Sequence, residues 1–200
     1  HTVAMVGDGV NDVLAMKDAD CSVAMAGGSD IARNVSHLVL LNSDFASMPR
    51  AVAEGRKAIN NIQRSASLFL TKTIYSFLLA ILFFVIPAPY PFIPIQMTLI
   101  SAVTIGIPSF VLALEPNREK IKGNLFTNIV NKSIPAALTV ICCLMACVGT
   151  YMLFDIPMER YSTLTVVSTG IIGIMLIYNI SVPFNSLRKT LFYSVVALLF

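Results

Sequence analysis

The chain carries two different patterns of hydrophobic positions, which change at about residue 43. Before that point, short apolar runs alternate with helical patterns. The expected strands are 2–6, 22–25 and 38–41, and the expected helices are 10–17 and 29–36. Strands that alternate with short helices favour an α/β fold with a parallel sheet. Residues 1–43 are therefore predicted to be the end of such a domain. Upstream sequence should complete it, because this piece alone is too small for a sound core.

From residue 62 onward, the apolar runs are long enough to cross a bilayer. The expected spans are about 62–86, 95–114, 134–154 and 162–182, followed by a shorter run at 190–200. A transmembrane helix needs about 20 apolar residues to cross ~30 Å of hydrocarbon. The composition agrees with membrane insertion, because 56% of the residues are hydrophobic and only 12% are charged. Residues 62–200 are therefore predicted to form an α-helical transmembrane bundle in a lipid bilayer.

The stretch 44–61 lies between these two patterns and mixes charged with apolar residues. Asp44 is a short polar acceptor just before a helical run, which is typical of an N-cap. Apolar residues then recur at helical spacing. We expect a stalk helix over 44–61 that continues without a break into the first span. The chain begins at His1 and ends at Phe200 inside an apolar run, so we expect a fragment of a longer protein.

Charged residues outside the spans predict the orientation in the membrane. The loops 115–133 and 183–189 carry Lys and Arg, loop 87–94 carries no charge, and loop 155–161 is mixed. Positively charged loops favour the cytoplasmic side, so residues 1–61 are expected in the cytoplasm. The net charge of +3 is spread along the chain and forms no clustered basic face. This distribution argues against nucleic-acid binding.

The stretch Gly7-Asp8-Gly9-Val10-Asn11-Asp12 follows the first expected strand and opens the first helix. Open α/β sheets bind their ligands at the carboxyl ends of parallel strands. Glycine lets a backbone approach a phosphate closely, and a helix N-terminus favours anions. Asp8 and Asp12 have the oxygen ligands that Mg²⁺ takes. The pattern predicts a phosphate and magnesium site; the alternative is a glycine-rich turn in an ordinary βα unit.

This hexapeptide resembles the last phosphorylation-domain motif of P-type ATPases, within the haloacid-dehalogenase-like superfamily. The resemblance continues in order through Ala15-Met16-Lys17-Asp18-Ala19-Asp20, Val23-Ala24-Met25, Gly28-Ser29-Asp30-Ile31-Ala32-Arg33 and Leu38-Val39-Leu40-Leu41. It implies a Rossmann-like phosphorylation domain that acts on ATP with Mg²⁺. Gly7 and Gly9 would form the turn that binds the phosphate.

The same resemblance implies a role for each polar residue of the motif. Asp8 is expected to help hold Mg²⁺, Asn11 to donate a hydrogen bond to the phosphoryl group, and Asp12 to complete the site as a second carboxylate. A simpler role for Asn11 or Asp12 is to cap the helix. The family's nucleophile stands in an Asp-Lys-Thr-Gly-Thr motif, which this sequence lacks. Catalysis is therefore expected to need the missing N-terminal part of the same chain.

Polar residues inside a span are costly and therefore informative. Lys72, Thr73 and Ser76 lie in the first span. In calcium and sodium pumps this helix supplies ion ligands near those positions, so the resemblance implies that these residues line a transport path. In some pumps a lysine in this helix acts as a built-in counter-charge, and Lys72 is a candidate for that role. The alternative is a lysine that snorkels to the interface.

The second span holds Ser101 and Thr104 ahead of Gly106 and Pro108. The glycine and proline should break the helix and free carbonyl oxygens toward a cavity. In the family that this stretch resembles, an ion-binding Asn stands at the position of Ser101 and an Asp stands at the position of Ile105. This loss of an anionic ligand argues against a standard site for two calcium ions, although one hard cation still has hydroxyl and carbonyl oxygens to bind.

The function expected from these features is an ATP-driven cation pump that works through an aspartyl-phosphate. Calcium is the leading candidate for the transported cation, and the bacterial cell membrane is the expected location. A phospholipid-translocating pump of the same family is one alternative, because few acidic residues line the spans. The other is a membrane regulator whose α/β domain binds phosphate without turnover.

Overall fold

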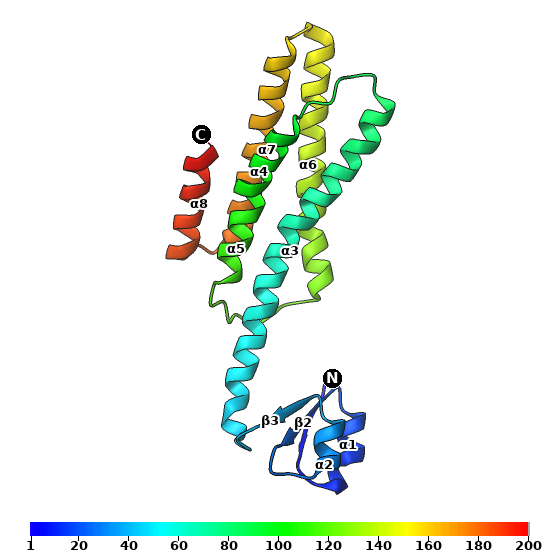
Figure 1. Ribbon diagram of the computed structural model, residues 1–200, viewed down its shortest axis with the longest axis vertical. Helices are drawn as coiled ribbons and strands as arrows, with labels where there is room; N and C mark the ends of the chain where they lie inside the picture. The colour runs from blue at the N-terminus through cyan, green and yellow to red at the C-terminus, as the bar shows by residue number, and fades with distance from the viewer. Residues whose placement is uncertain (200) are drawn as a thin grey trace. The chain divides into compact units, whose positions relative to one another are not determined.

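The computed structural model describes residues 1–199, which form two compact units (Figure 1). The first unit comprises residues 1–55 and the second begins at residue 56. The first holds a small parallel sheet with short helices, and the second is entirely helical. The predicted fold class, an α/β piece followed by a transmembrane helical bundle, is confirmed.

Three parallel strands form the sheet of the first unit, in the order β1-β2-β3. They are β1 (Ala4–Gly7), β2 (Cys21–Met25) and β3 (Leu38–Leu40). The connecting helices are α1 (Val13–Asp18) and α2 (Asp30–Val35). Both helices lie on the same side of the sheet (Figure 1). This follows because both crossovers advance in the same direction and crossovers are right-handed.

The core of this unit is small. Met16, Ala24 and Ala32 are buried at its centre, between the sheet and the two helices. The predicted helix 10–17 divides into a 3-10 helix, Val10–Asp12, and α1. The tight turn after β1 explains the division, since 3-10 turns are common where a chain enters an α-helix.

The second unit is built from long helices. They are α3 (Met48–Val85), which begins in the first unit, α4 (Pro94–Ser101), α5 (Ile107–Ala113), α6 (Leu125–Phe154), α7 (Met158–Ser181) and α8 (Ser186–Leu199). Four stretches are long and apolar enough to cross a membrane: Phe45–Val85, Pro94–Ala113, Leu125–Phe154 and Met158–Ser181. Residue 200, the end of the predicted run 190–200, lies outside the described residues.

Helix boundaries differ from the hydropathy pattern where polar residues continue a helix. Helix α6 begins at Leu125, well before the predicted span 134–154, and contains Pro135. Its first turns are too polar for the span pattern but still form backbone hydrogen bonds. The predicted N-cap is present, because the Asp44 side chain accepts a hydrogen bond from the Ala46 N–H at 2.8 Å.

The predicted break in the second span is wrong, because the helix continues from Pro94 to Ala113 by way of a π-helix. Residues Ala102–Gly106, here called the π segment, connect α4 to α5. Pro108 lies in the first turn of α5, where its missing N–H costs least. The helix therefore widens rather than ending, and π segments are frequent at functional sites.

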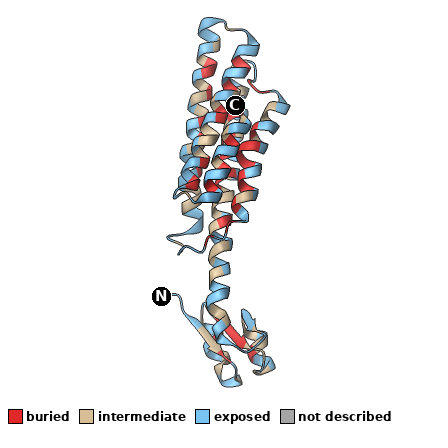
Figure 2. Cartoon of the chain, turned by 90° about the vertical axis from the view of Figure 1, so that its left-hand side faces the viewer, coloured by how far each residue is buried: buried red, intermediate tan, exposed pale blue. Residues whose placement is uncertain are grey.

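Buried residues of the second unit follow the facing sides of the helices (Figure 2). One cluster joins the π segment to α7 and α8 through Val103, Ile177 and Val195. A second cluster joins α3, α4 and α6 through Tyr75, Ile100 and Leu144. The π segment thus belongs to the first cluster, and α4 just before it belongs to the second.

Candidate functional site

The loop after β1 carries the candidate phosphoryl site. Strand β1 ends at Gly7, and the 3-10 helix begins at Val10. Asp8 therefore stands at the carboxyl end of β1, the edge where open α/β sheets bind ligands. Asp8 and Asn11 are exposed, so both are accessible to a ligand.

Asp12 holds this loop in shape. Its Oδ2 atom accepts hydrogen bonds from the backbone N–H groups of Asp8 and Gly9, both at 3.1 Å. Asp12 precedes α1, but its side chain makes no capping bond to that helix. The carboxylate therefore turns back to the loop rather than forward to the helix. One of its two oxygens is committed to positioning Asp8.

Two glycines allow the close packing around Asp8. A Cβ on Gly28 would lie 2.5 Å from the Asp8 carbonyl oxygen and 2.9 Å from its Cα. The Ser29 N–H donates to that same carbonyl at 2.7 Å. A Cβ on Gly7 would lie 2.6 Å from the Asp12 Cβ. The neighbouring Gly27, by contrast, would meet only the Ser43 hydroxyl, at 3.4 Å. The sequence did not predict the contact of Gly28 with Asp8.

The loop provides one suitable ligand for a hard cation but not a complete set. An exposed carboxylate such as Asp8 is the ligand type that Mg²⁺ prefers. Within residues 1–199, no group of three or more His, Cys, Asp or Glu side chains gathers to hold a metal ion. A cation at Asp8 would therefore take its remaining ligands from water, from a phosphate or from groups outside this stretch.

A small cavity in the second unit brings together part of the predicted transport path. It has a volume of about 20 Å³ and is lined by residues of α3, α6, α7, the π segment and the end of α4. Lys72 and Thr104 line it, together with Thr71 and Thr169. That volume is enough for about one water molecule.

The three threonine hydroxyls of the cavity all donate to their own helices. Thr71 donates to the Ser67 carbonyl at 2.8 Å, Thr104 to the Ile100 carbonyl at 2.7 Å, and Thr169 to the Thr165 carbonyl at 2.8 Å. With its proton committed, each hydroxyl oxygen has only lone pairs left to offer. Most of the other lining residues are apolar, among them Leu68, Ile100 and Val140.

The remaining predicted path residues lie elsewhere. Thr73 is exposed and donates to the Phe69 carbonyl at 3.0 Å. The hydroxyls of Ser76 and Ser101 are buried and lack a hydrogen-bond partner among the described residues. Neither serine lines the cavity. Thr71 was overlooked as a lining residue, although helical spacing from Leu68 and Tyr75 places it on the buried face.

Thr104 packs directly on α7. A Cβ added to Gly173 would lie 2.8 Å from the Thr104 Cγ2 atom. The glycine thus lets the π segment approach α7 closely, which brings Thr104 and Thr169 to the same cavity. Sequence reasoning did not single out Gly173, since nothing in its local pattern shows what lies opposite.

Known proteins resemble this chain over much of its length. A calcium-transporting ATPase of Mycolicibacterium smegmatis, CtpE, is 49% identical over 150 residues, which is 70% of this chain and 19% of that protein. The probable cation-transporting ATPase exp7 of Streptococcus pneumoniae is 39% identical over 199 residues, which is 96% of this chain and 26% of that protein. A calcium-transporting ATPase of Bacillus subtilis is 37% identical over 116 residues, which is 58% of this chain.

The chain spans only about a fifth to a quarter of the length of the first two of these relatives. No protein-family model matches it. The likeness to exp7 nevertheless extends over almost the whole chain, from the α/β unit into the membrane helices. On this likeness and on the motif that positions Asp8, the chain belongs to the family of P-type cation-transporting ATPases.

Proposed function

We propose that the intact protein is an ATP-driven cation pump and that this chain supplies part of its phosphoryl site and part of its transport path. The observation that carries the proposal is the Asp8 loop, which Asp12 and Gly28 hold in one conformation at the carboxyl end of β1. The names of the relatives support the same activity, since each is an ATPase that transports a cation.

At the phosphoryl site, Asp8 is the residue that would contact Mg²⁺. A cation held there would neutralise charge on the phosphoryl group during its transfer from ATP. The exposed Asn11 would donate its side-chain amide hydrogen to a phosphoryl oxygen. Gly7 and Gly9 leave the backbone open to the phosphate. Asp12 acts through the loop, because its Oδ2 orients the Asp8 backbone; its direct contact with Mg²⁺ stays a prediction.

In the membrane, the cavity beside Lys72 is our candidate for part of the transport path. Its threonine oxygens suit a hard cation, and the predicted path residues Thr73, Ser76 and Ser101 would complete it with groups from the rest of the protein. Lys72 would act as the counter-charge when the path is empty. Calcium is the proposed cargo, because CtpE and the Bacillus subtilis relative are named calcium-transporting ATPases.

The four apolar helices support a multi-pass membrane protein. We assign residues 1–61 to the cytoplasm and the protein to a bacterial cell membrane, from the loop charges and from the organisms of these relatives. The phospholipid-translocating alternative is not favoured, because these relatives are named for cation transport.

The test is cation-dependent ATP hydrolysis by the intact protein in lipid vesicles. Ca²⁺, Mn²⁺, Na⁺ and K⁺ are varied at fixed Mg²⁺, and Asp8→Ala is compared with Asp18→Ala. Asp18 is a matched control because it is another exposed aspartate of the same unit, at the end of α1. We expect stimulation by one cation, lost in Asp8→Ala and kept in Asp18→Ala.

Other outcomes separate the alternatives. Hydrolysis that ignores every cation but responds to added phospholipid would support a lipid pump. Phosphate binding without hydrolysis would support the regulator. Full activity in Asp8→Ala would remove the phosphoryl site from this loop.

A further inference from the structure

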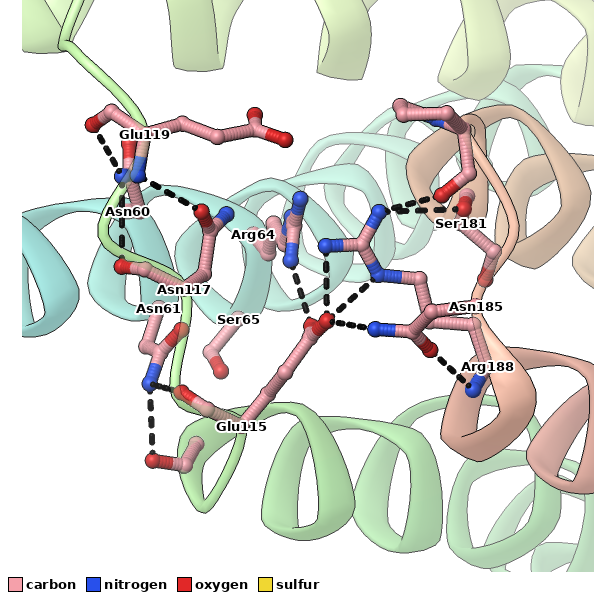
Figure 3. A network of polar contacts seen from close by, with 12 residues as sticks. Asn60, Asn61, Arg64, Ser65, Glu115, Asn117, Glu119, Ser181, Asn185 and Arg188 are labelled. Carbon is pink, nitrogen blue, oxygen red and sulfur yellow. Dashed lines mark hydrogen bonds and ion pairs between the residues drawn. The ribbon is translucent and has the colours of Figure 1, made fainter.

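A buried charged cluster joins three parts of the second unit, at the end of the bundle opposite the α3–α4 connection (Figures 1 and 3). Glu115 follows α5 and is 2% exposed. Its Oε2 atom accepts from Arg64 of α3 at 2.6 Å. Its Oε1 atom accepts from Arg188 of α8 at 2.7 Å and from Asn185, just before α8, at 2.6 Å.

We propose that Glu115, Arg64 and Arg188 are positioning residues for the transport path. They fix α5 and the adjoining π segment against α3 and α8, which keeps Thr104 in register with Lys72 across the cavity. This inference rests on the proposed pump function. In this proposal the cluster does not bind the cation. It affects cation binding only by fixing the positions of α5 and the π segment.

The electrostatics of the cluster favour a role in fixing the relative positions of α3, α5 and α8 over a simple gain in stability. One carboxylate faces two guanidinium groups, and the Glu115, Arg64 and Arg188 side chains are only 2%, 11% and 4% exposed. Buried ion pairs recover little net stability after desolvation, and their best-attested role is to fix register. Removing the carboxylate would leave two poorly hydrated cations facing each other. The arrangement therefore tolerates only one relative position of the three segments.

Backbone contacts between α3 and the end of α5 reinforce this position (Figure 3). The Asn61 side chain donates to the carbonyls of Ala113 and Glu115 at 2.9 and 2.8 Å. The Ser65 hydroxyl donates to the Ser109 carbonyl at 3.2 Å. The Ala113 carbonyl belongs to the last turn of α5, where carbonyls lack intrahelical partners, whereas the Glu115 carbonyl lies just after α5 and also accepts the Asn117 N–H at 2.9 Å. Side chains of α3 thus cap α5, so α5 and α3 are held together.

The other side of the π segment is held by a different helix. Ser162 of α7 donates to the Gln96 side chain of α4 at 3.1 Å. Polar contacts thus link α5 to α3 and α4 to α7, and the π segment connects α4 with α5. Thr104 lies within it and lines the same cavity as Lys72. A change at Glu115 would shift α5 relative to α3 and so alter the spacing of the cavity walls.

The experiment measures ATP hydrolysis by the intact pump in vesicles against Ca²⁺ concentration, for wild type and Glu115→Gln. We expect the half-maximal Ca²⁺ concentration to rise roughly 3- to 30-fold, the range for changes that act on coupling without touching a ligand. The half-maximal ATP concentration should stay unchanged. Glu159→Gln is the matched control, because it neutralises an exposed glutamate in the first turn of α7.

A second set of variants keeps the test decisive if Glu115→Gln accumulates poorly. Arg64→Lys keeps the positive charge but loses the planar guanidinium group. It should raise the half-maximal Ca²⁺ concentration by a smaller factor than Glu115→Gln. Glu115→Gln combined with Arg64→Gln should shift the Ca²⁺ dependence by less than the sum of the two single changes.

Two results would overturn the inference, and they are distinguishable. If the variants lower only the maximal rate, in proportion to folded protein, while the Ca²⁺ dependence is that of wild type, the cluster is a structural contact and the pump function stands. If wild type shows no response to any cation, the proposed function fails and this inference fails with it.

Discussion

Asp12 positions Asp8 by its own carboxylate, whose Oδ2 accepts the Asp8 backbone N–H at 3.1 Å. The second acid of the motif thus shapes the loop that presents the first. The two residues are four positions apart, and the turn between them includes Gly9, whose N–H binds the same oxygen. This relationship makes the loop sensitive to changes that leave Asp8 itself intact.

Asp12→Ala should loosen this loop. Two backbone N–H groups lose their acceptor, which we expect to cost about 1 kcal/mol of local stability for a partly exposed site. Hydrogen exchange in the intact protein, followed on peptides that cover residues 7–13, should become faster there and stay unchanged over 125–154. Equal exchange in the variant and in wild type would show that the carboxylate does not hold the loop.

Gly28→Ala should displace Asp8. The added Cβ would lie 2.5 Å from the Asp8 carbonyl oxygen, so the loop must move. A displacement near 1 Å in a catalytic group can lower a rate by roughly 100-fold, and we expect ATP hydrolysis to fall to that extent. The matched control is Gly27→Ala, whose Cβ meets only the Ser43 Oγ at 3.4 Å. If the two variants lost activity equally, crowding of Asp8 would not be the cause.

Thr104→Val should weaken cation binding. The substitution keeps the shape of the side chain and removes the hydroxyl of a residue that lines the cavity. Loss of one polar contact to a charged group corresponds to about a tenfold rise in the half-maximal cation concentration for ATP hydrolysis. Thr98→Val is the control, since Thr98 is exposed on α4 and makes the same kind of bond, to the Pro94 carbonyl at 3.0 Å. A wild-type cation response in Thr104→Val would move the path away from this cavity.

Gly173→Ala should push the π segment away from α7. The new Cβ would stand 2.8 Å from Thr104 Cγ2 and 3.0 Å from its Cβ. We expect a lower melting temperature in detergent together with a weaker cation response. In Gly149→Ala of α6, the new Cβ would meet no atom of residues 1–199 within 4 Å apart from its own helix backbone, and the substitution should raise helix stability by about 0.5–1 kcal/mol. A lower melting temperature for Gly173→Ala together with a higher one for Gly149→Ala would support the close approach of the π segment to α7.

Much of this architecture follows from local patterns. The strand–helix alternation predicted the parallel sheet, because strand and helix periodicities are properties of neighbouring residues. The apolar runs predicted all four candidate spans for the same reason. Asp44 predicted a helix start, since caps act within a few residues. Gly106 and Pro108 predicted a break in the second span, but the helix only widens there into a π-helix.

Boundaries and contacts between distant segments did not follow in this way. Hydropathy placed the start of α6 near residue 134, whereas the helix begins at Leu125, because backbone hydrogen bonding continues through polar residues that hydropathy excludes. Thr73 and Thr71 are equally polar in sequence, yet only Thr71 lines the cavity. Which face of α3 is buried depends on the helices packed against it.

The sequence by itself determined the family motif around Asp8, the order of strands and helices, and the presence of membrane spans, because each depends on residues close together in the chain. The tertiary structure decided that Gly28 packs on Asp8, that Gly173 receives Thr104, and that Glu115 joins Arg64 and Arg188. The residues of these pairs lie between 20 positions apart, for Asp8 and Gly28, and 73 positions apart, for Glu115 and Arg188. Their meeting depends on how whole elements pack, and no local pattern of residues encodes that packing.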